Sequence, residues 1–162
     1  MTPAAQLAEV RRLLASPGGS VHLVGIGGIG MAGVAFHLAQ RGLCVHGCDV
    51  QAGRMMDWVR SHGIAAITGH DPRHVEGSVG WVVRSSAVPR HHPELVAASA
   101  RNLPILDRGI VLAGLLEGYQ SVAIAGTHGK TTTTAMVTQI LRAANPETAF
   151  CIGGEVPTLG GP

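Results

Sequence analysis

Lysine is almost absent from this sequence of 162 residues: Lys130 is the only one, and every other residue of the Lys+Arg total of 12 is arginine. Aromatic residues make up only 3%, and the formal net charge is only +2. Because the charge is small and the arginines are scattered, we expect neither a nucleic acid nor a membrane surface as a partner. The apolar runs are too short to span a membrane, and residues 1–20 lack the apolar core of a signal peptide.

Cysteine is also scarce, and Cys44, Cys48 and Cys151 match neither a metal-binding spacing nor a disulfide framework. We therefore expect three reduced thiols in a cytoplasmic protein. The 9 histidines share no spacing, which disfavours a structural metal site. Hydrophobic residues still reach 46%, enough for a sizeable core, and the 23 glycines suit an α/β protein with many tight strand–helix turns.

The stretch Val122–Thr134 has the pattern of a strand, a phosphate loop and a helix. It fits the short form G-x-x-G-K-T, whereas Ile124 stands where the longer phosphate-loop pattern has its first glycine. Glycines let the backbone approach an anion, and the amides that begin the next helix point at it. The alternative is an ordinary strand–helix turn with an exposed lysine. The predicted nucleotide contacts are Gly126, Thr127, His128, Gly129, Lys130, Thr131 and Thr132.

Two of these side chains carry specific chemistry. Lys130 supplies a compact charge for the β- and γ-phosphates, and Thr131 offers its hydroxyl to Mg²⁺. His128 lies inside the loop, where it either touches phosphate or serves as a spacer.

A second glycine loop follows the apolar strand Val21–Val24. It contains G-x-G-x-x-G, opens a helix over 31–40, and is followed by a strand at Cys44–Cys48 with Asp49 at its end. This is the βαβ context of a dinucleotide-type fold. Asp49 is predicted to accept hydrogen bonds from ribose hydroxyls, and the alternative is that it caps the next helix.

The remaining pattern repeats strand and helix, which predicts an α/β fold: a doubly wound, Rossmann-like parallel sheet followed by the start of a second α/β domain with the phosphate loop. Further strands are expected at 64–68, 80–84, 104–106, 122–125 and 148–152, and further helices at 4–15, 55–62, 94–101, 108–116 and 132–144. We place the first domain at 1–106 and the second, incomplete, at 107–162. Two strands make no core, so the second domain needs further domains or another copy of the chain.

Ligands bind at the carboxyl ends of parallel strands, so the loops there are the candidate site of the first domain. These contacts are Gly25, Gly27, Gly28, Ile29, Gly30, Asp49, His70, Ser85 and Ser86. His70 alone would more often be an ordinary loop histidine, and Ser85 and Ser86 alone would be turn formers. Their common place at the sheet edge is the reason for including them.

Both glycine loops resemble those of the Mur ligase family, the first within Val21–Asp49 and the second within Ala125–Thr134. Shorter matches lie at Gly47-Cys48-Asp49, Gly69-His70, Ser85-Ser86-Ala87 and Gly153-Gly154-Glu155. The resemblance covers about residues 20–155. Within the family, the first loop and Ser85-Ser86-Ala87 favour the ligases that join L-alanine to UDP-N-acetylmuramate over those that attach a tripeptide.

The resemblance implies that the first domain binds UDP-N-acetylmuramate and not a nicotinamide cofactor, and that the second holds ATP with Mg²⁺ at Thr131. It implies a reaction in which the muramate carboxylate becomes an acyl phosphate that L-alanine attacks. Lys130 would be the catalytic residue, stabilising the charge on the transferring group.

The sequence also departs from the family pattern. Cys48 replaces a serine, and Ile110 and Gly114 stand where acidic residues are expected. Later parts of a ligase lie beyond residue 162, so this chain alone is expected to be inactive. The alternatives are a non-catalytic UDP-sugar- or nucleotide-binding module, including a truncated paralogue, and an NAD-dependent oxidoreductase. The oxidoreductase leaves the loop around Lys130 unexplained.

Overall fold

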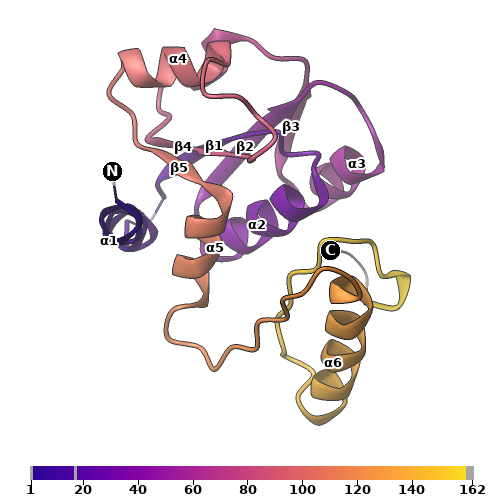
Figure 1. Ribbon diagram of the computed structural model, residues 1–162. Coiled ribbons are helices and arrows are strands. Elements are labelled where there is room, and N and C mark those ends of the chain that lie inside the picture. The colour runs from indigo at the N-terminus through magenta and orange to yellow at the C-terminus, as the bar shows by residue number, and fades with distance from the viewer. Residues whose placement is uncertain (1, 17, 160–162) are drawn as a thin grey trace.

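A five-stranded, fully parallel sheet forms the centre of the computed structural model, which describes residues 2–16 and 18–159 (Figure 1). The strands are β1 (Ser20–Val24), β2 (Cys44–Asp49), β3 (Ala65–Thr68), β4 (Trp81–Arg84) and β5 (Ile105–Asp107). The helices are α1 (Pro3–Leu14), α2 (Ile29–Gln40), α3 (Arg54–Ser61), α4 (Pro93–Ala100), α5 (Arg108–Leu116) and α6 (Lys130–Ala144), with short 3₁₀ helices η1 (Pro72–Val75) and η2 (Pro157–Leu159).

The strand order is β3-β2-β1-β4-β5, so the chain winds outward from β1 to β3 and then crosses to the other side of β1. This is the predicted doubly wound arrangement, and the fold class is confirmed. The direction of winding reverses between β1 and β4, which pair in register from Val21 with Trp81 to Val24 with Arg84. Open parallel sheets bind ligands at such a reversal, outside the carboxyl ends of the strands.

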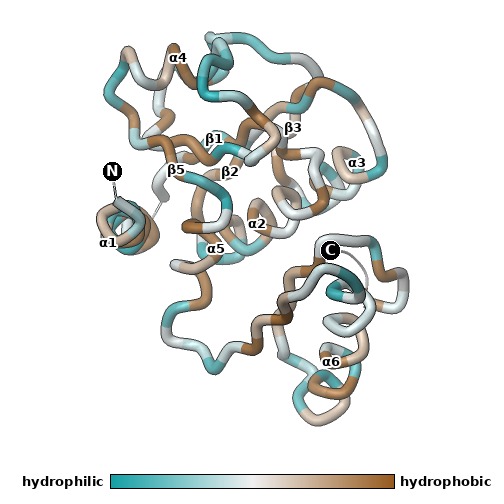
Figure 2. The backbone as a smooth tube through the Cα atoms, viewed as in Figure 1, coloured by the Kyte–Doolittle hydropathy of each residue, from teal (hydrophilic) through white to brown (hydrophobic). Residues whose placement is uncertain are grey.

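Helices cover both faces of the sheet, because the central strands are apolar on both sides. On one face, Leu23 and Val83 pack with α1, α2, α3 and α5. On the other, Val24 and Val82 pack with α4 and η1. Figure 2 shows the hydrophobic residues concentrated along the strands. The sequence did not predict η1, which the Asp71 side chain caps by accepting the Arg73 N–H.

Gly114 explains how α1 joins this unit. A Cβ atom added at Gly114 would collide with Val10 of α1, so the missing side chain lets the two helices approach closely. Val111 and Leu115 of α5 are buried in the same core as β1. We call residues 3–116 the sheet unit and residues 117–159 the C-terminal segment; the predicted division at 106 and 107 stays a prediction.

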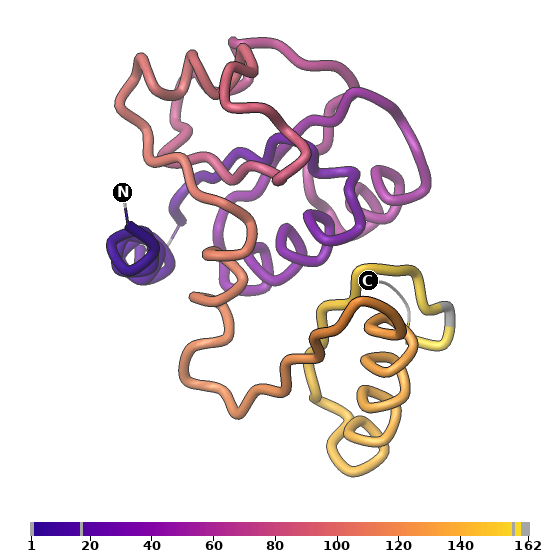
Figure 3. Tube along the Cα trace, viewed as in Figure 1, coloured from indigo at the N-terminus to yellow at the C-terminus, as the bar shows by residue number. Residues whose placement is uncertain are grey.

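Two predictions of secondary structure are wrong, because neither 122–125 nor 148–152 forms a strand. A parallel strand needs a hydrogen-bonded neighbour, and the part of the chain that the structure describes offers these segments no partner strand. The helix predicted between them is present as α6, but its apolar residues Met136 and Ile140 are exposed. Figure 3 shows the trace passing from α5 to α6 and returning beneath α2 and α3.

All three cysteines are free thiols, as predicted. Cys44 is exposed, Cys48 is buried and Cys151 is half-buried. Among residues 2–16 and 18–159, no helix has both the length and the apolar character that crossing a membrane requires.

Candidate functional site

The first glycine loop closes onto the end of β2. The amides of Gly25 and Ile26 both donate to the Cys48 carbonyl, at 2.8 and 3.0 Å, and Gly25 takes a positive φ of 87° that favours glycine. Gly28 is the N-cap of α2. Within the described residues, the Ile29 and Gly30 N–H groups donate no hydrogen bond, so the start of α2 has free amides for an anion.

Asp49 organises this loop from the neighbouring strand. Its Oδ2 accepts the Gly27 N–H at 2.9 Å. The capping alternative is excluded, since α3 begins at Arg54 after Gly53, with no side-chain cap. A Cβ atom added at Gly27 would lie 3.0 Å from Asp49 Oδ2, so the glycine allows the close contact. Asp49 therefore connects the ends of β1 and β2 and is half-buried at the predicted ligand edge.

Ser85 and Ser86 follow β4, directly across the winding reversal from the glycine loop. The Ser85 N–H donates to the Val24 carbonyl at 3.3 Å, and its hydroxyl accepts the Ala87 N–H at 3.3 Å. A Cβ atom added at Gly25 would lie 3.3 Å from the Ser85 Cβ. The structure therefore brings these serines to the same edge as Gly25–Gly30 and Asp49.

His70 also lies at this edge, but its side chain turns toward a buried cluster. His70 Nδ1 lies 3.1 Å from Cys48 Sγ and 3.3 Å from Glu94 Oε1. Burial raises the pKa of the Cys48 thiol, and the Glu94 carboxylate raises it further. Burial alone would raise the pKa of Glu94, but hydrogen bonds from His22, Cys48 and the Asp71 amide outweigh it and lower the pKa to about 2.

Arg108 is a candidate that sequence reasoning missed. It begins α5 directly after β5, and a Cβ atom added at Gly30 would collide with its guanidinium. The side chain therefore covers the start of α2, where it adds a positive charge beside the free amides. The sequence signal was its position at the end of a strand, a place shared by the other candidates.

The phosphate loop is shaped by Gly126 and Gly129, whose φ angles are 154° and 75°. Gly129 is the N-cap of α6. Lys130 Nζ donates to the carbonyls of Gly126 at 2.6 Å and Thr127 at 3.1 Å, which holds the ammonium over the loop. In the part of the chain that the structure describes, the backbone N–H groups of 127–132 donate no hydrogen bond. A phosphate with Mg²⁺ at the exposed Thr131 fits this arrangement.

Residues 150–155 contact both the sheet unit and the phosphate loop. The Phe150 carbonyl lies 3.0 Å from His37 Nε2 of α2, and Glu155 pairs with Arg54 of α3 at 2.7 Å. A Cβ atom added at Gly154 would lie 2.7 Å from the Thr131 methyl group. Burial raises the pKa of the Cys151 thiol, and the positive charge of Arg108 opposes this. The segment thus contacts the sheet unit on one side and the phosphate loop on the other.

Comparison with known sequences gives a consistent result. The Mur ligase family, catalytic domain, matches residues 20–120. A UDP-N-acetylmuramate–L-alanine ligase of Acidothermus cellulolyticus is 44% identical over 142 residues, which is 88% of this chain and 30% of that protein. The protein of the same name from Salinispora arenicola is 42% identical over 98% of this chain and 30% of its own length. The chain thus spans about a third of these relatives.

Solved structures agree with the sequences. The UDP-N-acetylmuramate-alanine ligase of Thermotoga maritima superposes with a TM-score of 0.80 at 33% identity, covering 86% of this chain and 33% of that one. A murein peptide ligase of Psychrobacter arcticus gives 0.72 at 28% identity, covering 78% of this chain and 27% of that one. With the family matched over most of the sheet unit and the two glycine loops in the predicted order, the chain belongs to the Mur ligase family.

Proposed function

We propose that this chain is the front portion of an ATP-dependent ligase of peptidoglycan precursor synthesis, which joins L-alanine to UDP-N-acetylmuramate through an acyl phosphate in the cytoplasm. The observation that carries the proposal is the pair of anion-binding loops, at Gly25–Gly30 and Gly126–Thr131, in a chain 44% identical to a ligase of that name. The proposal includes the domain division at 106 and 107, and no nucleic acid or membrane takes part.

The sheet unit binds the UDP-sugar in this proposal. The free amides of Ile29 and Gly30 receive the diphosphate, and Arg108 adds a positive charge over the same helix start. Asp49 accepts hydrogen bonds on the uridine side with the carboxylate oxygen that Gly27 leaves free. Ser85 and Ser86 lie across the winding reversal, within reach of the same ligand.

The C-terminal segment holds ATP and Mg²⁺ in this proposal. When bound, ATP supplies the phosphoryl group that activates the substrate carboxylate. The exposed amides of 127–132 orient the phosphate chain, Thr131 offers a hydroxyl to the metal, and Lys130 keeps its charge over the loop without a buried partner. These are positioning and electrostatic roles, the main protein contributions to phosphoryl transfer.

A second candidate is a non-catalytic module that binds a UDP-sugar or nucleotide. The observation in its favour is the exposure of α6, whose apolar residues have no core in the described part of the chain. Pure protein of this length releases no phosphate in response to L-alanine and UDP-N-acetylmuramate under either candidate. Such release would show that this length is sufficient for turnover.

The test of the sheet unit compares ligands by thermal denaturation. UDP-N-acetylmuramate raises the melting temperature by about 4 °C or more when it is well above its Kd, because it binds only the folded state. UDP raises it less, and NAD and NADP leave it unchanged. Protection by NAD without protection by the UDP-sugar would contradict the ligase proposal for this unit and favour an oxidoreductase.

The matched variants are Asp49→Ala and Asp57→Ala. Asp57 is a carboxylate on α3 whose side chain is 74% exposed and pairs with Arg60 at 3.3 Å. Asp49→Ala weakens the shift caused by the UDP-sugar, Ser85→Ala weakens it less, and Asp57→Ala leaves it unchanged. Each shift is measured against the melting temperature of the same variant without ligand, because Asp49 also holds Gly27.

A further inference from the structure

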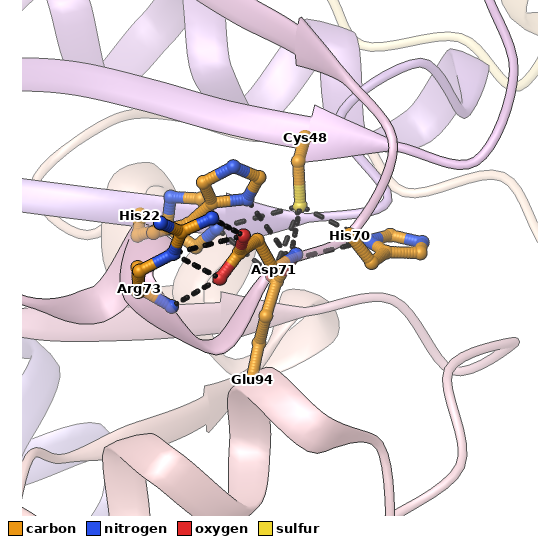
Figure 4. Close-up of polar contacts among 7 residues, drawn as sticks. His22, Cys48, His70, Asp71, Arg73 and Glu94 are labelled. Carbon is orange, nitrogen blue, oxygen red and sulfur yellow. Dashed lines mark hydrogen bonds and ion pairs between the residues drawn. The ribbon is translucent and has the colours of Figure 1, made fainter.

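A buried cluster of nitrogen, sulfur and oxygen ligands lies between the sheet and α4 (Figure 4). His22 comes from β1, Cys48 from β2, His74 from η1 and Glu94 from the start of α4. The ligand atoms of these four residues all lie within 4.8 Å of one another. The spacing along the sequence gave no sign of the cluster, because the fold assembles it from four separate elements.

The Glu94 carboxylate at the centre of the cluster accepts hydrogen bonds, including one from the Asp71 N–H at 2.9 Å. The side chains of Glu94 and His22 are 0% exposed. Among residues 2–16 and 18–159, neither an arginine nor a lysine pairs with Glu94, and its ion-pair partners are His22, His70 and His74. Burying a carboxylate costs free energy unless a positive charge compensates it. Histidine can be neutral or charged, and neutral histidine is also a common metal ligand.

The distances suit a small tetrahedral ion. Glu94 Oε2 lies 3.1 Å from His22 Nε2 and 2.9 Å from Cys48 Sγ, and Glu94 Oε1 lies 3.1 Å from His74 Nδ1. Cys48 Sγ lies 3.5 Å from His22 Nε2. Donor atoms around a tetrahedral Zn²⁺ are about 3.3–3.8 Å apart when the bonds are about 2.0–2.3 Å long. Three of the four measured distances are shorter than this, so small side-chain movements that separate the donors place all four around one ion.

We propose that His22, Cys48, His74 and Glu94 form a structural site for a divalent transition metal of the zinc type. Two imidazoles, a thiolate and a carboxylate are a donor set that suits Zn²⁺, whereas Mg²⁺ and Ca²⁺ prefer oxygen alone. Four protein ligands leave no open position, so the metal has a structural and not a catalytic role. The proposal does not depend on which substrate the sheet unit binds.

Metal entry removes one proton from the cluster. Cys48 loses its S–H proton as the sulfur–metal bond forms, and that proton leaves to water. His70 Nδ1, 3.1 Å from Cys48 Sγ, belongs to a side chain that is 23% exposed, so it lies on the side of the cluster that reaches solvent. The bound metal then joins two neighbouring strands to η1 and α4.

The test measures zinc in the full chain and in two cysteine variants. After incubation with ZnSO₄ and dialysis, the wild-type chain and Cys44→Ser each retain one zinc per chain, and Cys48→Ser does not. Loss of an outer-shell partner weakens metal affinity about tenfold to a hundredfold, so loss of the thiolate ligand weakens it at least as much. Cys44 is an exposed cysteine on the same strand and is the matched control. Equal retention by Cys48→Ser and Cys44→Ser would overturn the proposal.

A second measurement holds even where Cys48→Ser is poorly folded. In the double variant Cys44→Ser/Cys151→Ser, Cys48 is the only thiol. Added CoCl₂ then gives thiolate-to-cobalt absorption and the visible bands of a tetrahedral ion, and ZnSO₄ removes both. Zinc also raises the melting temperature of this variant, and Glu94→Gln added to it abolishes that rise. A cobalt complex without the thiolate absorption would show that the cluster is a hydrogen-bonded network and not a metal site.

Discussion

The sheet unit and the C-terminal segment contain one glycine loop each, but they differ in how their side chains are buried. Leu23 and Trp81 of the sheet unit are 0% and 1% exposed, whereas Val122 and Ile140 of the C-terminal segment are 70% and 69% exposed. The phosphate loop still has its shape, because it needs only local backbone geometry and the start of one helix. A clear motif therefore does not require a packed core around it.

The same difference predicts where stability comes from. Burial of apolar surface is the main favourable term in folding, and the buried clusters lie almost entirely within the sheet unit. Trp58 and Trp81 are the 2 tryptophans of the chain, and both belong to that unit. Their fluorescence reports unfolding of the sheet unit, while circular dichroism also reports α6.

The largest expected effect is that of Leu23→Ala. Removing a large buried side chain from β1 leaves a cavity, which lowers the free energy of unfolding by about 2–5 kcal/mol. Ile140→Ala, an aliphatic truncation on exposed α6, changes it by less than about 0.5 kcal/mol. Urea unfolding followed by tryptophan fluorescence measures both. Equal losses in the two variants would mean that α6 belongs to the same cooperative core, and the comparison between the two regions would fail.

The next effect compares two glycines with similar backbone angles. Gly25→Ala and Gly129→Ala each force an alanine to a positive φ, 87° and 75°, at a cost of about 1–2 kcal/mol. At Gly25 this strain, with the added contact to Ser85, lowers the stability of the sheet unit. At Gly129 it opens the start of α6 and leaves the fluorescence transition unchanged. Hydrogen exchange of Thr133, whose N–H donates to the Gly129 carbonyl, measures that local opening, and a shifted fluorescence midpoint for Gly129→Ala would contradict it.

Sequence patterns were sufficient where the signal is local or repeats along the chain. The helix at Arg108–Leu116 has the bounds that its apolar pattern predicted, and the order of strands and helices in the sheet unit is as expected. The predictions of strands at 122–125 and 148–152 were wrong because an apolar run becomes a strand only beside a partner strand. The residues alone cannot supply that partner.

The site shows the same limit. The loop glycines and Asp49 were found from spacing, because a motif fixes them relative to a strand end. Arg108 and the cluster around Glu94 were missed, because the fold brings their residues together from distant parts of the chain. Asp49 was predicted as a ligand contact from its place at the end of a strand. Its hydrogen bond with the Gly27 N–H, which holds the glycine loop, was not predicted.

Lys130→Ala tests the C-terminal segment by its binding and not by its stability. Lys130 is exposed, so its loss creates no cavity. The free energy of unfolding measured by tryptophan fluorescence therefore stays within about 0.5 kcal/mol of the wild-type value. The affinity of the Lys130→Ala variant for ATP with Mg²⁺ falls at least tenfold, or about 1.4 kcal/mol, because a charge held over the phosphates is lost. Calorimetry measures the affinity, and Arg142→Ala, a cation at the other end of α6, is the control. Equal affinity of Lys130→Ala and Arg142→Ala for ATP would contradict the proposal that this loop binds ATP.

The smallest effect is expected at the ion pair between the two regions. Arg54 and Glu155 are 2.7 Å apart, but their side chains are 84% and 32% exposed, so water and salt screen most of the attraction. A double-mutant cycle with Arg54→Ala and Glu155→Gln gives a coupling energy of about 0.2–1 kcal/mol, which decreases as salt is added. Urea unfolding followed by circular dichroism measures it, since the pair joins an already stable unit to a weakly packed one that contains α6. A larger coupling that persists in high salt would mean that the contact is shielded from water, and that residues 150–155 are a fixed part of the sheet unit.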